Sequence, residues 1–258
     1  MNILLAFKAE PDLSMLSEAD WQAAAPSGTG PDRTLMRSLM GNDEQGAAEL
    51  MLLARDVNPA LELSAVTIGD DRALPMLRHL AALGFSRRTL LTCEEELRFS
   101  PAFVAQQLAE QVQEQNAGLV LLGTQSSEGQ NGQTGWLLAE MLGWPCLSSV
   151  CGLNVDGEGF VVECEDLHQR SRWLVHQPAV LRVQNRGQMA LRVPGMRARL
   201  AAAKAEIDQR PCEAAAATVS CLSLARHLSR RRGIIIDEPA PQAAQRLWND
   251  YLAQRMKP

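Results

Sequence analysis

The sequence predicts an α/β fold built on a parallel sheet, and two observations support this. Up to Pro145, strand-like apolar runs alternate with helix-like segments, an order that calls for parallel strands joined by right-handed crossovers. The run Leu119–Leu122 is apolar at every position, as expected of a strand that helices cover on both faces. After Pro145 short strands follow one another, which predicts an antiparallel addition to the sheet.

Each predicted strand of the parallel part is a short apolar or alternating run. The segment 10–41 lacks a clear period and contains several prolines and glycines, so an irregular excursion or a hairpin is expected there. The strands are predicted at Ile3–Phe7, Leu61–Ile68, Arg88–Thr92 and Leu119–Leu122.

The helices between these strands show apolar residues at three- and four-residue spacing, with signals at their ends. Asp43 is expected to cap the first helix, and Ser100 followed by Pro101 is a strong start for the third. Gly84 and Gly143 are suited to end the second and fourth helices. The predicted helices span residues 43–57, 74–83, 101–116 and 134–142.

The second half of the chain changes character after the fourth helix. Strands are predicted at Phe160–Cys164, Arg172–His176 and Ala179–Val183, followed by an alanine-rich basic helix over Met196–Ile207. The remaining tail has a strand-like Ile234–Ile236 and an amphipathic helix containing Trp248 and Leu252, but too little apolar content to fold alone. We therefore expect an α/β domain over 1–195 and, over 196–258, a basic helix and an arm that packs on this domain or on a second subunit.

The composition and charge of the chain predict a globular protein and argue against a membrane or nucleic-acid-binding protein. The chain has 258 residues, 46% of them hydrophobic, and a net charge of −5, as in an ordinary soluble globular protein. No apolar run is long enough to cross a bilayer and strand-like residues follow Met1 directly, so neither membrane insertion nor a cleavable signal is expected. The net negative charge does not indicate a nucleic-acid-binding protein. The basic cluster Arg230–Arg232 is expected to be solvated or to face an acidic partner.

Cysteine and histidine spacing predicts no metal site. The six cysteines form no CxxC pair, so reduced thiols in a cytoplasmic protein are the expectation. The four histidines are scattered, although His168 and His176 could meet across a hairpin.

The loop Gly123–Thr134 is the most informative segment of the chain. It follows a predicted buried strand, precedes a helix, and is rich in glycine, hydroxyl and amide residues. Ligands of parallel sheets bind beyond the carboxyl ends of strands, and free N–H groups at a helix start favour anions. The loop therefore predicts a phosphate site, and the alternative is a polar surface loop without a ligand. It is not a Walker A loop, because Gln133 rather than lysine follows Gly132.

These residues resemble the beta subunit of electron-transfer flavoproteins, including the Fix-type members. The segment VLLGTQSSEGQNGQTGWLLAEMLGWP carries the family pattern of a strand, G-x-Q, a polar loop, Q-T-G, a helix and W-P. Weaker similarity covers ILLAFKAEPD, ALGFSRRTLL, QPAVLRV and VPGMRARLAAAK. The chain departs from the family at several places, notably at Thr124, where the family usually has lysine, so it resembles a divergent member.

The resemblance implies a Rossmann-like, adenine-nucleotide-binding domain. Many family members hold AMP in this site, and electron-bifurcating members hold a second FAD. Gln133 and Thr134 would be the side-chain phosphate partners. The implied cofactor-binding residues are Ala6, Gly41, Asn42, Asp43, Glu44, Ile68, Gly123, Thr124, Gln125, Ser126, Ser127, Asn131, Gly132, Gln133 and Thr134.

The resemblance also implies partners. The redox-active FAD would be held mainly by an alpha subunit, so the chain would be half of a heterodimer. Docking to a flavin dehydrogenase would fall on Val193, Pro194 and Met196, whose alternative interpretation is an ordinary helix start with proline as a breaker. Electrons would pass to a quinone reductase or a ferredoxin-like acceptor.

The leading hypothesis is thus a cytoplasmic electron carrier subunit with no catalytic residue of its own. One alternative is a stand-alone adenine-nucleotide-binding sensor or regulatory module, which would be complete without the tail. Another is an enzyme acting on an adenylated substrate, for which Glu128 is the one ionisable side chain in the loop.

Overall fold

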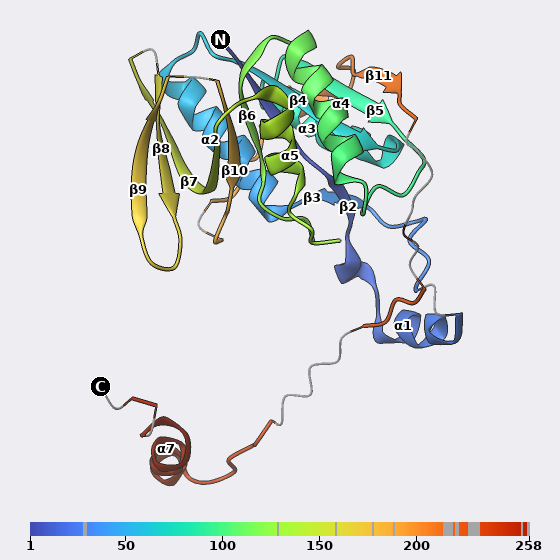
Figure 1. Ribbon diagram of the computed structural model, residues 1–258. Helices are drawn as coiled ribbons and strands as arrows, with labels where there is room; N and C mark the ends of the chain where they lie inside the picture. The colour runs from blue at the N-terminus through green and yellow to red at the C-terminus, as the bar shows by residue number, and fades with distance from the viewer. Residues whose placement is uncertain are drawn as a thin grey trace.

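A nine-stranded sheet forms the centre of the described part of the molecule (Figure 1). The computed structural model describes residues 1–27, 30–127, 129–157, 159–176, 178–187, 189–213, 219, 222–226, 233–253 and 255–256. The strand order is β11-β5-β4-β1-β6-β10-β7-β8-β9. In sequence order the strands are β1 (Asn2–Ala6), β4 (Glu62–Gly69), β5 (Arg87–Thr92), β6 (Ala117–Gly123), β7 (Cys146–Asp156), β8 (Gly159–Glu165), β9 (Arg170–Val175), β10 (Ala179–Val183) and β11 (Asp208–Pro211).

The sheet is parallel from β11 to β7, and β8 and β9 continue it as antiparallel strands. This confirms the predicted α/β class. One part of the prediction was wrong: β10 was expected in the antiparallel addition, but it lies parallel between β6 and β7. A short apolar run indicates a buried strand but not its direction, and β7 itself had not been predicted.

Helices cover both faces of the sheet, as the apolar runs require. The helices α2 (Asn42–Val57) and α3 (Leu74–Ala82) pack on one face with Ile3 and Leu5 of β1. The helices α4 (Pro101–Glu114) and α5 (Thr134–Leu142) pack on the other face with Leu4 and Ala6. Alternate residues of one strand thus enter two different cores, because successive side chains of a strand point to opposite faces.

The excursion between β1 and α2 contains the predicted hairpin. The strands β2 (Ala9–Pro11) and β3 (Ser38–Met40) pair antiparallel. Between them lies α1 (Glu18–Ala24), which had not been predicted and which Ser17 and Asp20 begin with a capping box. Short 3₁₀ turns occupy Leu13–Met15, Ala25–Ser27 and Asp71–Ala73.

The glycines predicted the C-terminal ends of helices better than the polar residues predicted the N-terminal caps. Gly143 adopts a left-handed conformation with φ 64° directly after α5, and Gly84 with φ 92° follows α3. Asp43 does not cap α2, because Gly41 is the cap residue and Asp43 lies in the first turn. Ser100 holds the cap position of α4, but its side chain makes no capping hydrogen bond.

The segment after residue 195 contributes to the same sheet. The helix α6 (Met196–Ala202) is shorter than predicted and packs against α3, and β11 pairs with β5 at the sheet edge. The helix α6 and the strand β11 thus join the α/β domain, and the division of the chain at residue 195 stays a prediction.

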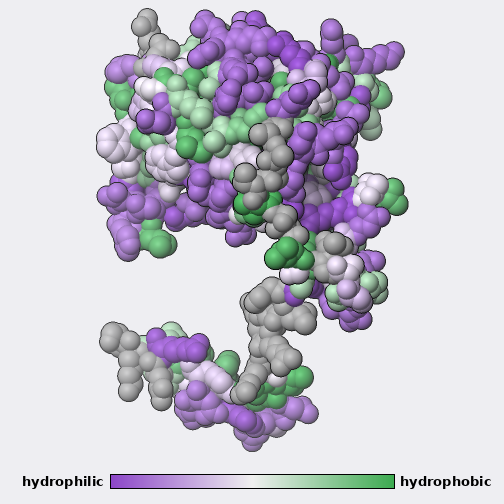
Figure 2. Space-filling model, turned by 45° about the vertical axis from the view of Figure 1, so that its right-hand side comes forward, coloured by the Kyte–Doolittle hydropathy of each residue, from purple (hydrophilic) through white to green (hydrophobic). Residues whose placement is uncertain are grey.

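The last described elements are α7 (Ala240–Leu247) and a π-helical turn (Trp248–Leu252), which Figure 1 shows apart from the sheet. They confirm the predicted terminal helix, whereas Ile234–Ile236 forms no strand. Hydrophobic residues are exposed on this C-terminal segment (Figure 2), where Trp248 is 48% exposed. That the arm packs on a partner stays a prediction, and Arg230–Arg232 lie outside the described residues.

His168 lies in the turn between β8 and β9 while His176 follows the far end of β9, so they do not meet across the hairpin. Among the described residues no group of three or more His, Cys, Asp or Glu side chains could hold a metal ion. Likewise, no described helix has the length and apolar character that crossing a membrane requires.

Candidate functional site

A pocket opens at the carboxyl ends of β1, β4 and β6. The chain leaves β1 for β4 on one side and later returns to β6 on the other. The crevice at such a switch in strand order is the usual ligand site of open parallel sheets. The topology therefore forms a pocket where the sequence predicted a binding site.

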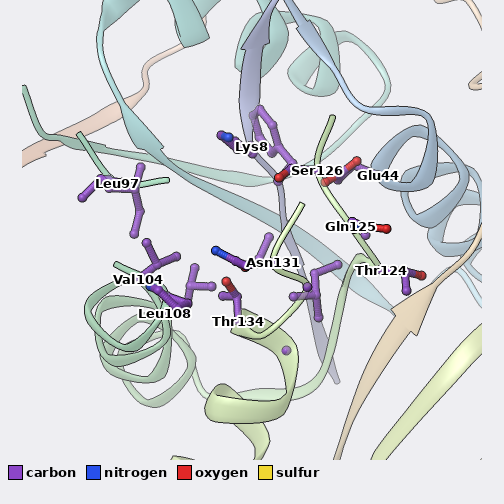
Figure 3. A pocket seen from close by; sticks show the side chains of 18 of the residues that line it. Lys8, Glu44, Leu97, Val104, Leu108, Thr124, Gln125, Ser126, Asn131 and Thr134 are labelled. Atoms are coloured by element: carbon purple, nitrogen blue, oxygen red, sulfur yellow. The ribbon is translucent and has the colours of Figure 1, made fainter. Parts of the chain in front are cut away.

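The pocket has three different walls (Figure 3). Leu97, Val104 and Leu108 form an apolar wall on α4 and the loop before it. Asn131 and Thr134 stand at the start of α5. The third wall includes Lys8, Glu44 and Ser126. An apolar cleft with a few convergent polar groups is typical of sites for small ligands.

The structure brings most of the sequence-predicted site residues together in this pocket. Their contact with a ligand stays a prediction. The predicted residues that line the pocket are Ala6, Glu44, Ile68, Gly123, Thr124, Gln125, Ser126, Asn131, Gly132 and Thr134.

Five predicted residues do not line the pocket, and four of them are Gly41, Asn42, Ser127 and Gln133. Gly41 and Gln133 are the N-terminal cap residues of α2 and α5. The amide of Asn42 donates to the backbone oxygen of Asn185 at 2.7 Å. The backbone N–H of Ser127 donates to Glu10 at 3.0 Å, and the hydroxyl of Ser127 donates to the same carboxylate oxygen. These residues hold the walls of the pocket in place.

Asp43 is the fifth, and it links three segments. Its carboxylate accepts from the backbone N–H of Thr124 at 3.2 Å and from that of Asn185 at 2.8 Å. The first turn of α2 is thereby joined to the ends of β6 and β10. Hydrogen bonds to an ionised group are the stronger kind, so Asp43 fixes the start of the loop.

Glu44 is the most unusual side chain of the pocket. It is buried, and its Oε2 atom has no hydrogen-bond partner among the residues that the structure describes. Burial, and after it the nearby carboxylates of Glu10 and Asp43, raise the pKa of Glu44 to about 7. A Cβ atom at Gly123 would lie 2.6 Å from this carboxyl group, and one at Gly41 would overlap it as well. The carboxyl group thus lies close against the backbone at both glycines, which the sequence alone could not reveal.

Arg182, which the sequence patterns did not single out, supports the loop of the pocket from outside the pocket lining. Its guanidinium donates to the backbone oxygens of Thr124 and Gly132, at 3.0 and 2.9 Å, and to Ser148 Oγ at 3.0 Å. The same group lies 4.6 Å from the ring centre of Trp136. The only available signal was its presence as the one charged residue in the apolar strand Ala179–Val183.

Further bonds keep the loop closed. The amide of Asn131 donates to the backbone oxygen of Arg98 at 2.7 Å, and its Oδ1 atom accepts from the backbone N–H of Gln133 at 3.3 Å. The amide of Gln125 donates to the backbone oxygen of Gln130 at 2.6 Å. Glu128, the one acid predicted in the loop, lies outside the described residues.

The predicted docking segment lies elsewhere, at the start of α6. Val193 is 76% exposed and Met196 is 70% exposed, whereas Pro194 is buried. Arg192 anchors the segment to α2 through Glu49 at 2.7 Å and Asp56 at 2.7 Å. Two apolar side chains are thus presented to solvent on a fixed support.

The chain is similar in sequence to known electron transfer flavoprotein subunits. Residues 44–230 match the model of the electron transfer flavoprotein domain. YgcR of Escherichia coli K12, provisionally named an electron transfer flavoprotein subunit, is 49% identical over 259 residues and covers 100% of both chains. The electron transfer flavoprotein subunit beta of Bradyrhizobium diazoefficiens is 30% identical over 54% of this chain and 55% of its own. CarD, a subunit of the caffeyl-CoA reductase-Etf complex of Acetobacterium woodii, is 26% identical over 63% of this chain and 60% of its own.

Proposed function

The chain belongs to the electron transfer flavoprotein family and acts in electron transfer as a beta-type subunit, and from this premise we propose that its pocket holds an adenine nucleotide. The observation that carries the proposal is the position of the polar loop and the start of α5 at the carboxyl ends of β1, β4 and β6. Backbone N–H groups at a helix start favour a phosphate. The family assignment favours this carrier role over a stand-alone sensor.

The three walls fit the parts of a nucleotide. The phosphate would meet Asn131, Thr134 and the loop backbone. The apolar wall on α4 suits the flat face of a base. The unpartnered oxygen of Glu44 suits a hydrogen-bond donor such as a ribose hydroxyl or an amino group. The ligand would be AMP, or a second FAD that uses the same adenylate contacts.

We also propose partners for the chain. An alpha-type subunit would complete the heterodimer and hold most of the redox-active FAD, which supplies the electron-transfer chemistry when bound. This chain would contribute the docking segment and the arm beyond Pro211. A flavin dehydrogenase would donate the electrons, and a quinone reductase or a ferredoxin-like protein would accept them in the cytoplasm.

The proposed function is tested by the nucleotide content of the complex. The chain should be co-expressed with the alpha-type subunit encoded in the same genome, and the released nucleotides identified by chromatography and absorbance. One FAD and one AMP per heterodimer would support a simple carrier, and two FAD would indicate electron bifurcation. A chain that forms no flavin-containing complex would contradict the proposed role.

Docking gives a separate prediction. The double variant Val193→Ser and Met196→Ser should lower the rate of electron transfer from the partner dehydrogenase at least tenfold, because each buried apolar side chain contributes about 1.5–3 kcal/mol to an interface. Since both side chains are exposed in the free chain, the melting temperature and the nucleotide content should not change. Stopped-flow reduction of the heterodimer measures the effect.

Leu167→Ser is the matched control, because Leu167 is 87% exposed in the turn between β8 and β9. It should leave the rate unchanged. Equal effects of the control and the double variant would argue against this docking surface.

A further inference from the structure

Arg182 carries a buried positive charge that no described acid neutralises. Its side chain extends from β10, and the residue is 6% exposed. Its hydrogen-bond partners are a hydroxyl group and two backbone oxygens, and its Nε atom has no partner. In the described part of the chain no carboxylate forms an ion pair with it, and burial lowers the pKa of the guanidinium. A buried charge without a counterion is costly, so a charged ligand is the natural complement.

The position of this charge is equally informative. The side chain of Arg182 passes directly behind the first turn of α5, where a Cβ atom at Gly135 would lie 2.9 Å from its Cγ and Cδ atoms. At Gly132 a Cβ atom would lie 3.5 Å from its Nη2 atom. Both glycines line the pocket. The guanidinium therefore stands one residue layer behind the wall on which the proposed phosphate would rest.

We propose that Arg182 is the positioning residue for the anionic group of the ligand: it holds the loop from behind and supplies the positive charge that the loop itself lacks. This inference rests on the proposed nucleotide site. The loop Gly123–Thr134 contains no lysine or arginine. Arg182 adds its field to that of the α5 N-terminus, and both act on the same group. A phosphate in turn neutralises the buried cation.

A purely structural role for Arg182 makes a different prediction. If the side chain only props up the loop, its removal would weaken every ligand of the pocket equally. If its charge acts on the phosphate as well, removal would weaken AMP binding far more than the binding of adenosine, which has the same base and ribose without the charge. The ratio of the AMP affinity to the adenosine affinity therefore distinguishes an effect of the Arg182 charge from an effect on the shape of the loop.

The experiment uses the full chain in complex with its alpha-type subunit, after bound nucleotide has been released. Calorimetric titrations with AMP and with adenosine are compared for the wild type, Arg182→Lys and Arg182→Gln. Both variants lose the planar fork of arginine, but only lysine keeps the charge. Circular dichroism checks that each variant is folded. If Arg182→Gln does not fold, Arg182→Met replaces it, because methionine keeps an apolar stem against Trp136.

The expected result is a loss of AMP affinity of about tenfold or more in Arg182→Gln, with adenosine affinity within about twofold of the wild type, as a through-space charge at intermediate dielectric predicts. Arg182→Lys should retain most of the preference for AMP. Equal losses of AMP and adenosine, or no loss of AMP, would overturn the inference and leave the nucleotide site standing. A wild-type complex that binds neither AMP nor FAD would overturn the proposed site as well.

Discussion

Replacing Glu44 by glutamine should stabilise the nucleotide-free chain by about 3 kcal/mol at pH 8. Burial raises the pKa of Glu44 to about 7 from its ordinary value of 4.5, so above pH 7 the folded chain must hold a buried negative charge. Glutamine keeps the size of the side chain and removes that charge. Because single substitutions usually destabilise a protein, a stabilisation of this size would be distinctive.

The sign of the pH dependence follows from the direction of the shift. Below about pH 4.5 Glu44 is protonated in both the folded and the unfolded chain, and it costs nothing. Between pH 4.5 and 7 the unfolded chain releases this proton and the folded chain keeps it, so the free energy of unfolding falls as the pH rises. The carboxylates of Glu10 and Asp43 strengthen the shift, and Lys8 opposes it. Above pH 7 the difference is constant.

Urea denaturation of the wild type and of Glu44→Gln at pH 4.5 and pH 8 measures this effect. The two proteins should agree within about 0.5 kcal/mol at the lower pH and separate at the higher one. Glu140→Gln, at an exposed position of α5, is the matched control and should show no pH-dependent difference. A stabilisation of the same size at both pH values would mean that Glu44 does not titrate in this range.

Replacing Asn185 by alanine should destabilise the chain by about 3 kcal/mol. Asn185 is buried, and its amide donates to the backbone oxygens of Met189 at 2.7 Å and Asn42 at 3.1 Å. Its Oδ1 atom accepts from the backbone N–H groups of Gly187 at 3.1 Å and Met189 at 3.2 Å. Alanine would remove these four hydrogen bonds, each with a net contribution of about 0.5–1.5 kcal/mol. The partner groups lie in exposed or half-buried residues, so water would replace part of this loss.

The consequence of Asn185→Ala should also reach the docking segment. The turn that Asn185 closes leads to Arg192 and onward to Val193, so partner docking should weaken together with stability. Thermal and urea unfolding measure the first effect, and dehydrogenase-driven reduction measures the second. Asn154→Ala, at an exposed position of β7, is the control, and an equal loss of stability there would remove the special role of the buried amide.

The sequence by itself determined the class of the fold and the place of the candidate site. The continuous apolar run Leu119–Leu122 predicted a buried strand with helices on both faces. The polar loop after it had to lie at the carboxyl edge of the sheet, because the loop follows the strand. Both conclusions depend on which residues follow one another along the chain, and the sequence shows this directly.

Only the tertiary structure decided which residues support that site. Asp43 was expected to cap α2, but it joins α2 to the ends of β6 and β10. The strand β10 was expected in the antiparallel addition, but it lies parallel inside the sheet. Segments that are distant along the chain bury Glu44 and so raise its pKa. Distant segments also surround Arg182, whose Nε atom has no hydrogen-bond partner among the described residues. The electrostatic and hydrogen-bond environment of a side chain depends on which segments contact it in the folded chain. A local pattern of residues does not show which distant segments these are.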